Sequence, residues 1–358
     1  GRGTYLTTEK EYRDFVLQLD YRLTPGAESG ICLRGVPNVR IGDPQQHGRG
    51  KGSGGLSSNP AGSLGREPRI VADRPAGTWN QMRILMVGSR VSVWLNEQPV
   101  VEHAILENPF DQKLPEAQRR PVPVIGPIQL QTHSGEIRWR NLAIREIGSE
   151  EACRILAEVG RDRFTPIFNG RDFTGWSGAL EAATVRDGVL SWGKGKGGVL
   201  YWDEWLTDFK VRLMFRLESA SNNGLAIRYP GAGRPAYDAM CELQILAEDF
   251  DWVKKEIDPR QAHGSVYGKV AAMRGYQQPI GEWNFQEVTV KGSRITVELN
   301  GTCILDADVD KVDLSTAMGK TPYTGSRRRE GYLGFAGHRD VAEFRDLLLQ
   351  KLSLEEKH

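Results

Sequence analysis

One strand-like segment in the second half of the chain carries two polar side chains that could do chemistry. Glu242 and Gln244 lie two residues apart in CELQIL (residues 241–246), so both point to the same face of a strand. Burying two polar groups in a hydrophobic core is costly unless they are paired. The segment therefore predicts that this face lines a concave binding groove, where a carboxylate could transfer protons.

Two histidines close strand-like segments, one in each half of the chain. His338 ends GYLGFAGH (residues 331–338), and His133 ends GPIQLQTH (residues 126–133). Because histidine transfers protons near neutral pH and also ligates metals, we expect His338 to be catalytic together with Glu242, and His133 to be its counterpart in the first half. Alternatively, each histidine holds its turn through a backbone hydrogen bond.

Further polar residues flank the same segments and are candidates for catalysis or ligand binding. Arg228 and Arg34 end matching hairpins, where an arginine binds ligand oxygens or, alternatively, forms an ion pair at a sheet edge. The remaining candidates for ligand binding are Asp238, His263 and Tyr267 in the second half and Arg40 in the first.

No motif identifies a metal. His263, His338 and Glu242 could share an ion, but their separations match no ligand pattern. The loop Glu248–Asp251 is acidic enough to suggest Ca²⁺, although solvated loop charges explain it as well. A divalent metal, either Ca²⁺ or a transition metal, is left open.

The segments that must position these residues occur twice. Phe15–Arg34 (FVLQLDYRLTPGAESGICLR) corresponds to Phe209–Arg228 (FKVRLMFRLESASNNGLAIR) at a constant spacing of 194 residues. GSRVSVWLN at 88–96 corresponds to GSRITVELN at 292–300, and the two histidine-ending segments also correspond. Internal repetition of this kind predicts two copies of one domain.

Both copies alternate apolar and polar residues in short runs separated by turn residues, which is typical of antiparallel strands. We therefore predict an all-β fold of two tandem jelly-roll β-sandwiches, at residues 1–147 and 164–353. The segment 148–163 is the only convincing helix and forms a helical linker, starting at Ser149. The Gly- and Ser-rich segment 44–66 is expected to be a surface loop, either mobile or overhanging a ligand site.

Composition excludes several classes of function. The 47 basic and 46 acidic side chains give a net charge of +1, so no overall field favours nucleic acid or a membrane surface. No apolar run approaches the ~20 residues that span a bilayer. The four cysteines form no metal or CxxC motif, and we expect those in strand-like runs, Cys32, Cys241 and Cys303, to be buried thiols, with a Cys241–Cys303 disulfide left open.

Several segments together resemble the 3-keto-disaccharide hydrolase domain family, which has a concanavalin-A-like jelly-roll fold. In the second copy these segments are FNGRDFTGW, CELQIL, GEWN, VKGSRITVELNG and GYLGFAGH; in the first copy they are SGICLRG, GTWNQMRI and GPIQLQTHSGEIRWRNLAIREI. The resemblance implies a periplasmic or secreted enzyme that cleaves 3-keto-glycosides. We also expect residues, including an export signal, to precede Gly1 in the natural protein.

The chemistry implied by that substrate follows from its ketone. A carbonyl at C3 acidifies the hydrogen on C2, so a base can form an enolate, the aglycone leaves from C1, and water adds back. Such a site needs a base, a cation or metal near the ketone oxygen and an acid for the leaving group. We assign these tasks to His338, Glu242 and Arg228.

Two other functions stay open. The same fold hosts non-catalytic glycan-binding proteins, and it also hosts endo-glucanases, although no Glu-x-Asp-x-x-Glu strand occurs here. The second copy is the expected catalytic domain, because the first has Asn38 and Arg40 where the second has Glu242 and Gln244. Aglycone release from a 3-keto-glucoside separates an enzyme from a lectin.

Overall fold

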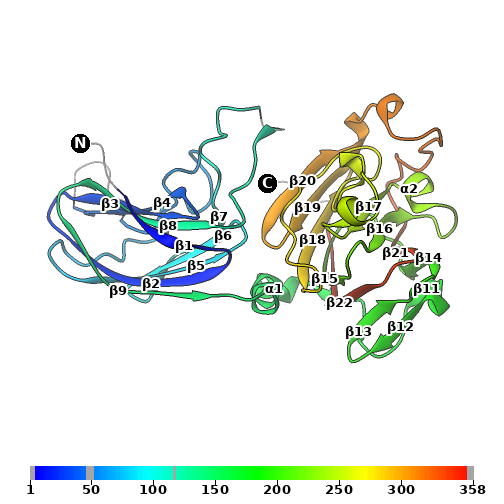
Figure 1. The fold of residues 1–358 in the computed structure, drawn as a ribbon, viewed down its shortest axis with the longest axis horizontal. Helices are drawn as coiled ribbons and strands as arrows, with labels where there is room; N and C mark the ends of the chain where they lie inside the picture. Colours follow the sequence, from blue (N-terminus) through cyan, green and yellow to red (C-terminus); the bar gives the residue numbers. More distant parts are fainter. Residues whose placement is uncertain (1–4, 46–51, 116–117, 353–358) are drawn as a thin grey trace. The chain divides into compact units, whose positions relative to one another are not determined.

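The computed structural model describes residues 5–45, 52–115 and 118–352 and shows a chain built almost entirely of strands (Figure 1). Its Cα positions divide into two compact units, Gly1–Ala152 (unit 1) and Cys153–His358 (unit 2). The prediction of an all-β fold of sandwiches is confirmed. None of the helices in the described ranges is long and apolar enough to cross a membrane.

In its described part, unit 1 has two antiparallel sheets, with strand orders β1-β8-β3-β4 and β7-β6-β5-β2-β9. The strands are β1 (Tyr5–Tyr12), β2 (Phe15–Leu23), β3 (Glu28–Leu33), β4 (Val36–Gly42), β5 (Asn80–Val87), β6 (Arg90–Leu95), β7 (Gln98–Ile105), β8 (Gly126–Ser134) and β9 (Ile137–Glu146). Part of the predicted loop at 44–66, residues 46–51, lies outside the described residues.

The described part of unit 2 also has two sheets, ordered β11-β14-β21-β16-β17 and β12-β13-β22-β15-β18-β19-β20, with β10 pairing with β22. The strands of the first sheet are β11 (Trp176–Gly178), β14 (Gly197–Trp202), β16 (Asn222–Tyr229), β17 (Cys241–Leu246) and β21 (Tyr332–His338). Those of the second are β10 (Thr165–Pro166), β12 (Ala183–Arg186), β13 (Val189–Trp192), β15 (Phe209–Leu217), β18 (Asn284–Lys291), β19 (Arg294–Leu299), β20 (Thr302–Asp308) and β22 (Ala342–Lys351).

Helices are few and short in the described residues. The α-helices are α1 (Ser149–Glu158), α2 (Pro235–Asp238) and α3 (Phe250–Val253), and the 3₁₀ turns are η2 (Arg161–Arg163), η3 (Leu180–Ala182), η4 (Pro259–Gln261), η5 (Val309–Lys311) and η6 (Leu314–Thr316). The helix predicted at 148–163 stops early because Gly160 adopts a left-handed conformation with φ 60°, which ends the α-helical run before η2. The division between the units falls within α1, after Ala152.

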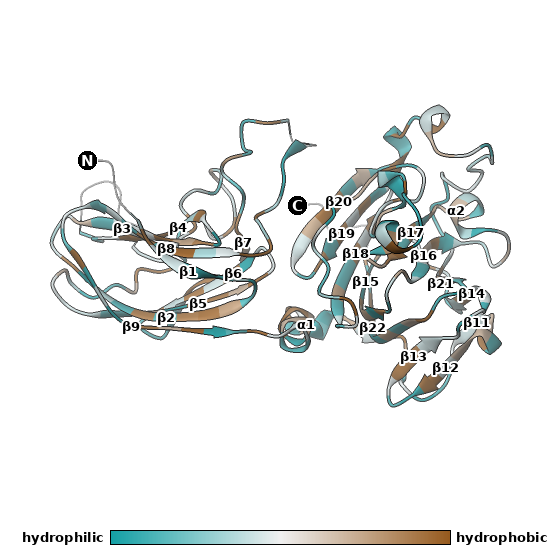
Figure 2. Cartoon of the chain, in the orientation of Figure 1, coloured by the Kyte–Doolittle hydropathy of each residue, from teal (hydrophilic) through white to brown (hydrophobic). Residues whose placement is uncertain are grey.

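Each unit encloses its own hydrophobic core between its two sheets. In unit 1, Leu17 and Leu19 of one sheet pack with Ile31 of the other. In unit 2, Phe335 of β21 stacks on Phe344 of β22, with ring centroids 4.1 Å apart. Figure 2 shows apolar stretches along strands such as β5 and β13 and hydrophilic residues in many of the connecting loops. Burial of these faces provides most of the stabilisation of such a sandwich.

Arg228, predicted to be catalytic, is instead an internal ion-pair partner in unit 2. Its side chain is 0% exposed, and Nη2 lies 2.8 Å from Asp208 Oδ1. Its guanidinium also donates to the carbonyl oxygens of Thr207, Gly292 and Arg328. Because every one of these acceptors belongs to the protein, the prediction that Arg228 binds a ligand is wrong, and the alternative of an ion pair describes it.

Arg34 has the same role in unit 1, so its prediction as a substrate-binding residue is corrected as well. Nη2 lies 2.8 Å from Asp14 Oδ1, and Nη1 donates to the carbonyl oxygens of Gly88 and Pro123. Both arginines have φ 53°. The repeated arginine at the end of the hairpin therefore marks a structural ion pair in each copy.

The local backbone explains why these arginines leave the sheet face. The pairing of β16 with β21 shifts register between Ala226 and Tyr229, and the left-handed Arg228 lies inside that irregularity. A Cβ at Gly331 would lie 2.4 Å from the Arg228 carbonyl carbon, so only glycine fits beside it. A bulge of this kind redirects a side chain that simple alternation would place on the pocket face.

We expect Arg228→Met to destabilise unit 2 by about 3–5 kcal/mol, because it leaves the Asp208 carboxylate without its buried partner. Urea unfolding combined with hydrogen exchange measured by mass spectrometry would assign the loss to unit 2. The matched variant Arg34→Met should produce a comparable loss in unit 1. Unchanged stability of unit 2 in Arg228→Met would contradict the structural role.

Candidate active site

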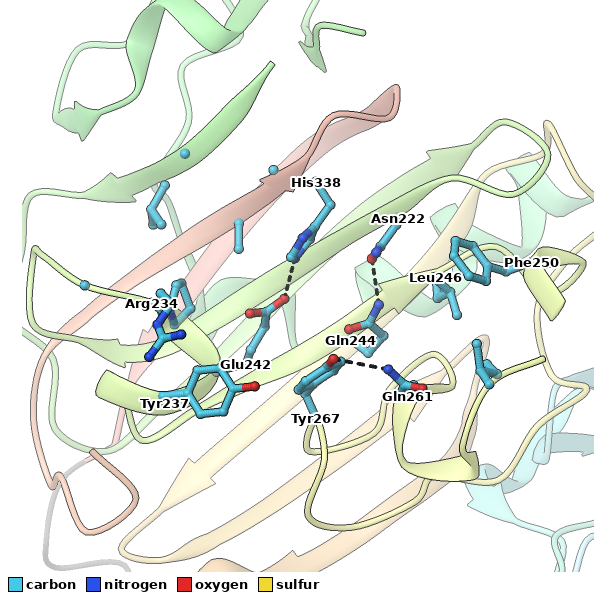
Figure 3. A pocket seen from close by; sticks show the side chains of 18 of the residues that line it. Asn222, Arg234, Tyr237, Glu242, Gln244, Leu246, Phe250, Gln261, Tyr267 and His338 are labelled. Atoms are coloured by element: carbon cyan, nitrogen blue, oxygen red, sulfur yellow. Dashed lines mark hydrogen bonds and ion pairs between the residues drawn. The ribbon is translucent and has the colours of Figure 1, made fainter. Parts of the chain in front are cut away.

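Strand β17 sends alternate side chains to opposite sides of its sheet. Three of its residues belong to the core of unit 2; they are Cys241, Leu243 and Ile245. Glu242, Gln244 and Leu246 point away from that core and line a pocket (Figure 3). The strand thus places a carboxylate and an amide side by side on one open face.

The pocket has a volume of about 430 Å³, which is within the range of small-molecule sites. Its floor is formed by strands β14, β16, β17 and β21, and its walls by the segments around α2, α3 and η4. The residues that line it are Gly198, Val199, Asn222, Gly233, Arg234, Pro235, Ala236, Tyr237, Glu242, Gln244, Leu246, Phe250, Lys255, Ile257, Gln261, Tyr267, Ala336, Gly337 and His338.

The structure brings Glu242 and His338 together in this pocket. Their side chains are 4% and 41% exposed, and Glu242 Oε1 lies 2.8 Å from His338 Nε2. Gly224, on the neighbouring strand, makes room for the carboxylate, since a Cβ there would lie 2.2 Å from Glu242 Oε1. A carboxylate oxygen accepts hydrogen bonds, so Nε2 carries the hydrogen and donates the hydrogen bond to Glu242 Oε1.

This contact changes the acidity of the histidine. Burial alone would lower the pKa of His338, but the hydrogen bond and charge of Glu242, together with the charge of Asp340, outweigh it and raise the pKa above its usual value. Asp340 is itself held by Lys254, with Oδ2 2.8 Å from Nζ. The imidazole is therefore a stronger proton acceptor than a free histidine.

Gln244 lies beside the Glu242–His338 pair with one hydrogen-bonding atom unused. Its Nε2 donates to Asn222 Oδ1 at 2.6 Å. Its Oε1 is buried and has no hydrogen-bond partner among the residues that the structure describes. A buried acceptor without a hydrogen bond lowers the stability of the folded protein by about 1–3 kcal/mol. A ligand hydroxyl that donates to this oxygen would remove that cost. The predicted substrate-binding residue Gln244 thus lies at the predicted place.

Tyr267 also lines the pocket, as predicted. Its hydroxyl accepts a hydrogen bond from Gln261 Nε2 at 3.1 Å, and burial raises the pKa of the phenol. Gln261 is fixed in turn, because its Oε1 accepts from the backbone N–H of Asp258. The phenol therefore stays protonated near neutral pH and is a proton donor directed by its neighbour.

Asp238 is placed next to the pocket rather than among its lining residues. Its Oδ2 accepts from the backbone N–H of Arg234 at 2.7 Å, and its Oδ1 accepts from Thr324 Oγ1 at 3.1 Å. These contacts fix the loop that presents Arg234 and Tyr237 to the pocket. The prediction of direct substrate binding is corrected, since the carboxylate holds the loop.

His263 is a core residue, and its prediction as a substrate-binding residue is wrong. Its ring stacks on Phe215 with centroids 4.9 Å apart, and Nε2 lies 2.9 Å from Gln286 Oε1. The backbone N–H of Leu246 donates to Nδ1. This pairing requires the neutral ring, and burial lowers the pKa of His263 to about 4.

Unit 1 has different groups at the matching positions. The strand register places Asn38 and Arg40 of β4 where β17 has Glu242 and Gln244, as expected from the repeat. The amide of Asn38 bonds to two side chains of its own unit, those of Ser57 and Gln131. Its hydrogen-bonding groups are thus occupied within the protein.

In unit 1, the side chains of Arg40 and His133 both lie next to Glu28. Arg40 Nη2 lies 3.3 Å from Glu28 Oε1, and His133 Nδ1 lies 3.7 Å from Glu28 Oε2. The imidazole is 61% exposed, so this pair is weakly held by comparison with Glu242 and His338. The structure therefore does not reproduce the buried carboxylate–histidine pair in unit 1, and the roles predicted for Arg40 and His133 stay predictions.

The acidic loop considered for Ca²⁺ is satisfied by protein groups. Arg274 pairs with Asp251 at 2.8 Å and with Glu248 at 3.5 Å, and Asp249 accepts from the backbone N–H of Ala220. Among the described residues, no group of three or more His, Cys, Asp or Glu side chains is arranged to hold a metal, so the set of His263, His338 and Glu242 is not formed.

None of the four cysteines is in a disulfide in the structure. Cys32, Cys153 and Cys241 are buried, whereas Cys303 is exposed on β20, which corrects the expectation that it is buried. The disulfide between Cys241 and Cys303 that the sequence left open is not formed in the structure.

Several pocket residues were missed in the sequence. Arg234 precedes the short helix α2 and Tyr237 lies within it, and Phe250, Lys255 and Ile257 follow β17 in a stretch that no strand pattern covers. The repeat supplies no signal for them, because the loops differ between the copies.

The sequence profile of the 3-keto-alpha-glucoside-1,2-lyase-like domain family matches residues 1–145 and 163–350. The chain therefore belongs to this family. A 3-keto-disaccharide hydrolase of Bacteroides thetaiotaomicron is 22% identical over 246 residues, which cover 58% of this chain and 85% of that protein. These relationships indicate a glycosyl hydrolase-like protein.

Several solved structures resemble part of this chain at low identity. A proposed glycosyl hydrolase from Parabacteroides distasonis is 23% identical, with 54% of this chain and 95% of that chain covered and a TM-score of 0.48. A second from the same organism is 21% identical, covers 53% and 99%, and has a TM-score of 0.46. The carbohydrate-binding module CBM66 of Bacillus subtilis is 10% identical, covers 49% and 96%, and has a TM-score of 0.31.

The buried His263 predicts how stability depends on pH. The unfolded chain protonates this histidine below its ordinary pKa, whereas the folded protein does so only near pH 4, so stability is full above pH 6.5 and falls as the pH drops towards 4. We expect about 2 kcal/mol to be lost from this group between pH 7 and pH 5.

Urea unfolding of the wild type and of His263→Gln at both pH values isolates the contribution. The variant should lose less stability than the wild type over this interval. Equal losses in the two proteins would show that His263 is protonated in the folded state.

Proposed function

We propose that unit 2 cleaves the glycosidic bond of 3-keto-glycosides by removal of the C2 proton, elimination of the aglycone and addition of water. The observation that carries this proposal is the buried Glu242 bound to His338 at 2.8 Å in a pocket of about 430 Å³. Membership of the 3-keto-alpha-glucoside-1,2-lyase-like family supports the substrate class.

The base in this scheme is the neutral imidazole of His338. Because Nε2 donates to the carboxylate of Glu242, Nδ1 is the nitrogen that accepts the C2 proton. The resulting imidazolium is stabilised by the adjacent negative charge, which is the same effect that raises its pKa. Glu242 is thus the residue that orients the base and strengthens it.

Loss of the C2 proton leaves an enolate with its charge on the C3 oxygen. The electron pair then forms the C1–C2 double bond, the bond from C1 to the aglycone oxygen breaks, and the ketone is restored. The departing oxygen takes a proton, for which Tyr267 is the donor in this scheme, since its raised pKa keeps it protonated. Water then adds its hydroxyl to C1 and gives its other proton to Tyr267, while His338 returns its proton to C2, so both side chains regain their starting protonation states.

Substrate binding follows from the unused groups of the pocket. The free acceptor Gln244 Oε1 takes a hydroxyl hydrogen of the sugar. The apolar wall, which includes Phe250 and Ile257, suits the less polar faces of the ligand. A conventional glycosidase pair is not needed, because elimination requires one base and one acid rather than two carboxylates across the bond.

Three further parts of the proposal rest on family likeness. They are a carbohydrate partner for the pocket, a periplasmic or secreted location and the substrate class; the divalent metal that the sequence left open stays a separate expectation, and no step above is assigned to it. The non-catalytic glycan-binding alternative is tested by the same assay as the enzyme, because a lectin would bind both the 3-keto-glucoside and the parent glucoside and release the aglycone from neither.

We expect His338→Ala to lower kcat/KM for a 4-nitrophenyl 3-keto-glucoside by about 10²–10⁴-fold, the usual contribution of a general base. Aglycone release measures the rate, and a thermal melt confirms that the variant is folded. The matched variant His133→Ala in unit 1 should retain full activity. Full activity in His338→Ala, or its loss in His133→Ala, would contradict the assignment to unit 2.

The pH dependence of kcat/KM tests the role of Glu242. Since neutral His338 is the active form, the rate should rise with pH through the raised pKa of the imidazole. In Glu242→Gln the carboxylate charge is absent, so burial is opposed only by the charge of Asp340, and the midpoint of that rise should move to lower pH. A midpoint that does not move would show that Glu242 does not control the base.

A further inference from the structure

The proposed reaction places negative charge on the C3 oxygen, and a positive group must lie near it. Arg228, predicted for this task, has its hydrogen bonds occupied inside the sandwich. Apart from His338, which acts here as a neutral base, the basic residues that line the pocket are Arg234 and Lys255. Which of these two residues lies near the C3 oxygen is an inference that rests on the proposed function and extends it.

Arg234 is held at the rim of the pocket by its backbone rather than by its charge. Its N–H donates to Asp238 Oδ2 at 2.7 Å, and its carbonyl accepts from the N–H groups of Tyr237 and Asp238. The loop is anchored further because Arg328 Nε donates to the carbonyl of Asp238 and the N–H of Gly325 donates to that of Tyr237. The backbone that carries the guanidinium is therefore fixed from several sides.

Within the described residues, no hydrogen-bond acceptor of the protein binds the guanidinium of Arg234. It lies over the ring of Tyr237, 4.7 Å from the centroid, and within the described part of the chain no carboxylate pairs with it. Other arginines near the pocket differ, since Arg274 pairs with Asp251 and Arg260 pairs with Asp258. An exposed guanidinium on an aromatic ring keeps its N–H groups available for a ligand.

Figure 3 shows how these groups lie around the carboxylate. Arg234 and Tyr237 are on one side of Glu242, and Gln244 with Asn222 is on the other. A sugar ring bound over Glu242 could therefore place its C2 hydrogen near His338, one hydroxyl at Gln244 and its C3 oxygen at Arg234.

Lys255 occupies a different wall. It follows α3 and lies between Phe250 and Ile257 in sequence, both of which contribute apolar surface to the pocket. The neighbouring residue Lys254 forms an ion pair with Asp340, which fixes this wall of the pocket. A cation there lies beside the apolar side chains of Phe250 and Ile257, whereas the guanidinium of Arg234 lies on the ring of Tyr237.

We propose that Arg234 is a catalytic residue that donates hydrogen bonds to the C3 oxygen of the 3-keto sugar and stabilises the enolate formed there. In this step the C2–H bond breaks, its proton goes to His338, and its electron pair forms the C2–C3 double bond as the carbonyl becomes an oxyanion. The guanidinium stays protonated throughout and supplies only charge and hydrogen bonds. Asp238 is the positioning residue for this loop.

The test compares Arg234→Gln with the wild type on a 4-nitrophenyl 3-keto-glucoside. We expect kcat to fall by about 10²–10³-fold with a smaller change in KM, because the interaction strengthens in the transition state. Arg186→Gln, which removes one exposed positive charge of unit 2 away from the pocket lining, should keep wild-type activity.

Arg234→Ala provides an independent readout, since added guanidinium chloride should restore part of its kcat and should not restore that of His338→Ala. Asp238→Asn should lower kcat less than Arg234→Gln. If the wild type cleaves the substrate and Arg234→Gln retains its kcat, or if Lys255→Gln alone loses activity, this inference is overturned and the proposed function stands. If the wild type releases no aglycone, the proposed function itself fails.

Discussion

The alternation of β17 is the constraint from which the site follows. Cys241, Leu243 and Ile245 enter the core of unit 2, and this fixes Glu242 and Gln244 on the opposite face. A slip of one residue in register would turn the carboxylate into the hydrophobic core and place three apolar side chains on the pocket face. The hydrophobic core therefore holds the polar pair in the pocket, although none of its residues reaches the ligand.

Small residues on the neighbouring strands also shape this region, because they leave space for larger side chains. Gly224 leaves the space that Glu242 occupies, and Gly337, next to His338 in β21, leaves space for Trp192, since a Cβ there would lie 2.0 Å from Trp192 Cε2. In unit 1 the matching glycine, Gly30, has the amide of Asn38 over it instead. The two units thus share the backbone arrangement and differ in the group that the arrangement presents.

The repeat in the sequence was sufficient to predict the all-β sandwiches and the shared face of Glu242 and Gln244. It also pointed to His338, because a strand end on the same sheet reaches the same face. The repeat was misleading for Arg228. A residue that recurs in both copies has a role common to both, and for Arg228 and Arg34 that role is an ion pair with the aspartate that precedes each hairpin. Periodicity cannot show the local irregularity that turns these side chains inward.

Other parts of the site lay beyond prediction for a different reason. His263 follows no strand pattern, and only its contacts with Phe215 and Gln286 show that it is a core residue. Arg234 and Tyr237 depend on a loop held by Asp238, and the first copy has no equivalent segment to reveal it. Loop-borne functional groups are positioned by contacts that are distant in sequence, which a local pattern does not record.

The central claim is that a sugar binds over Glu242 in unit 2, between His338 and Gln244. A crystal structure of Glu242→Gln with a 3-keto-glucoside tests it most directly. The account predicts a sugar in this pocket with its C2 atom next to the His338 imidazole and a hydroxyl at Gln244 Oε1. A sugar bound only at the matching face of unit 1, beside Asn38 and His133, would contradict it.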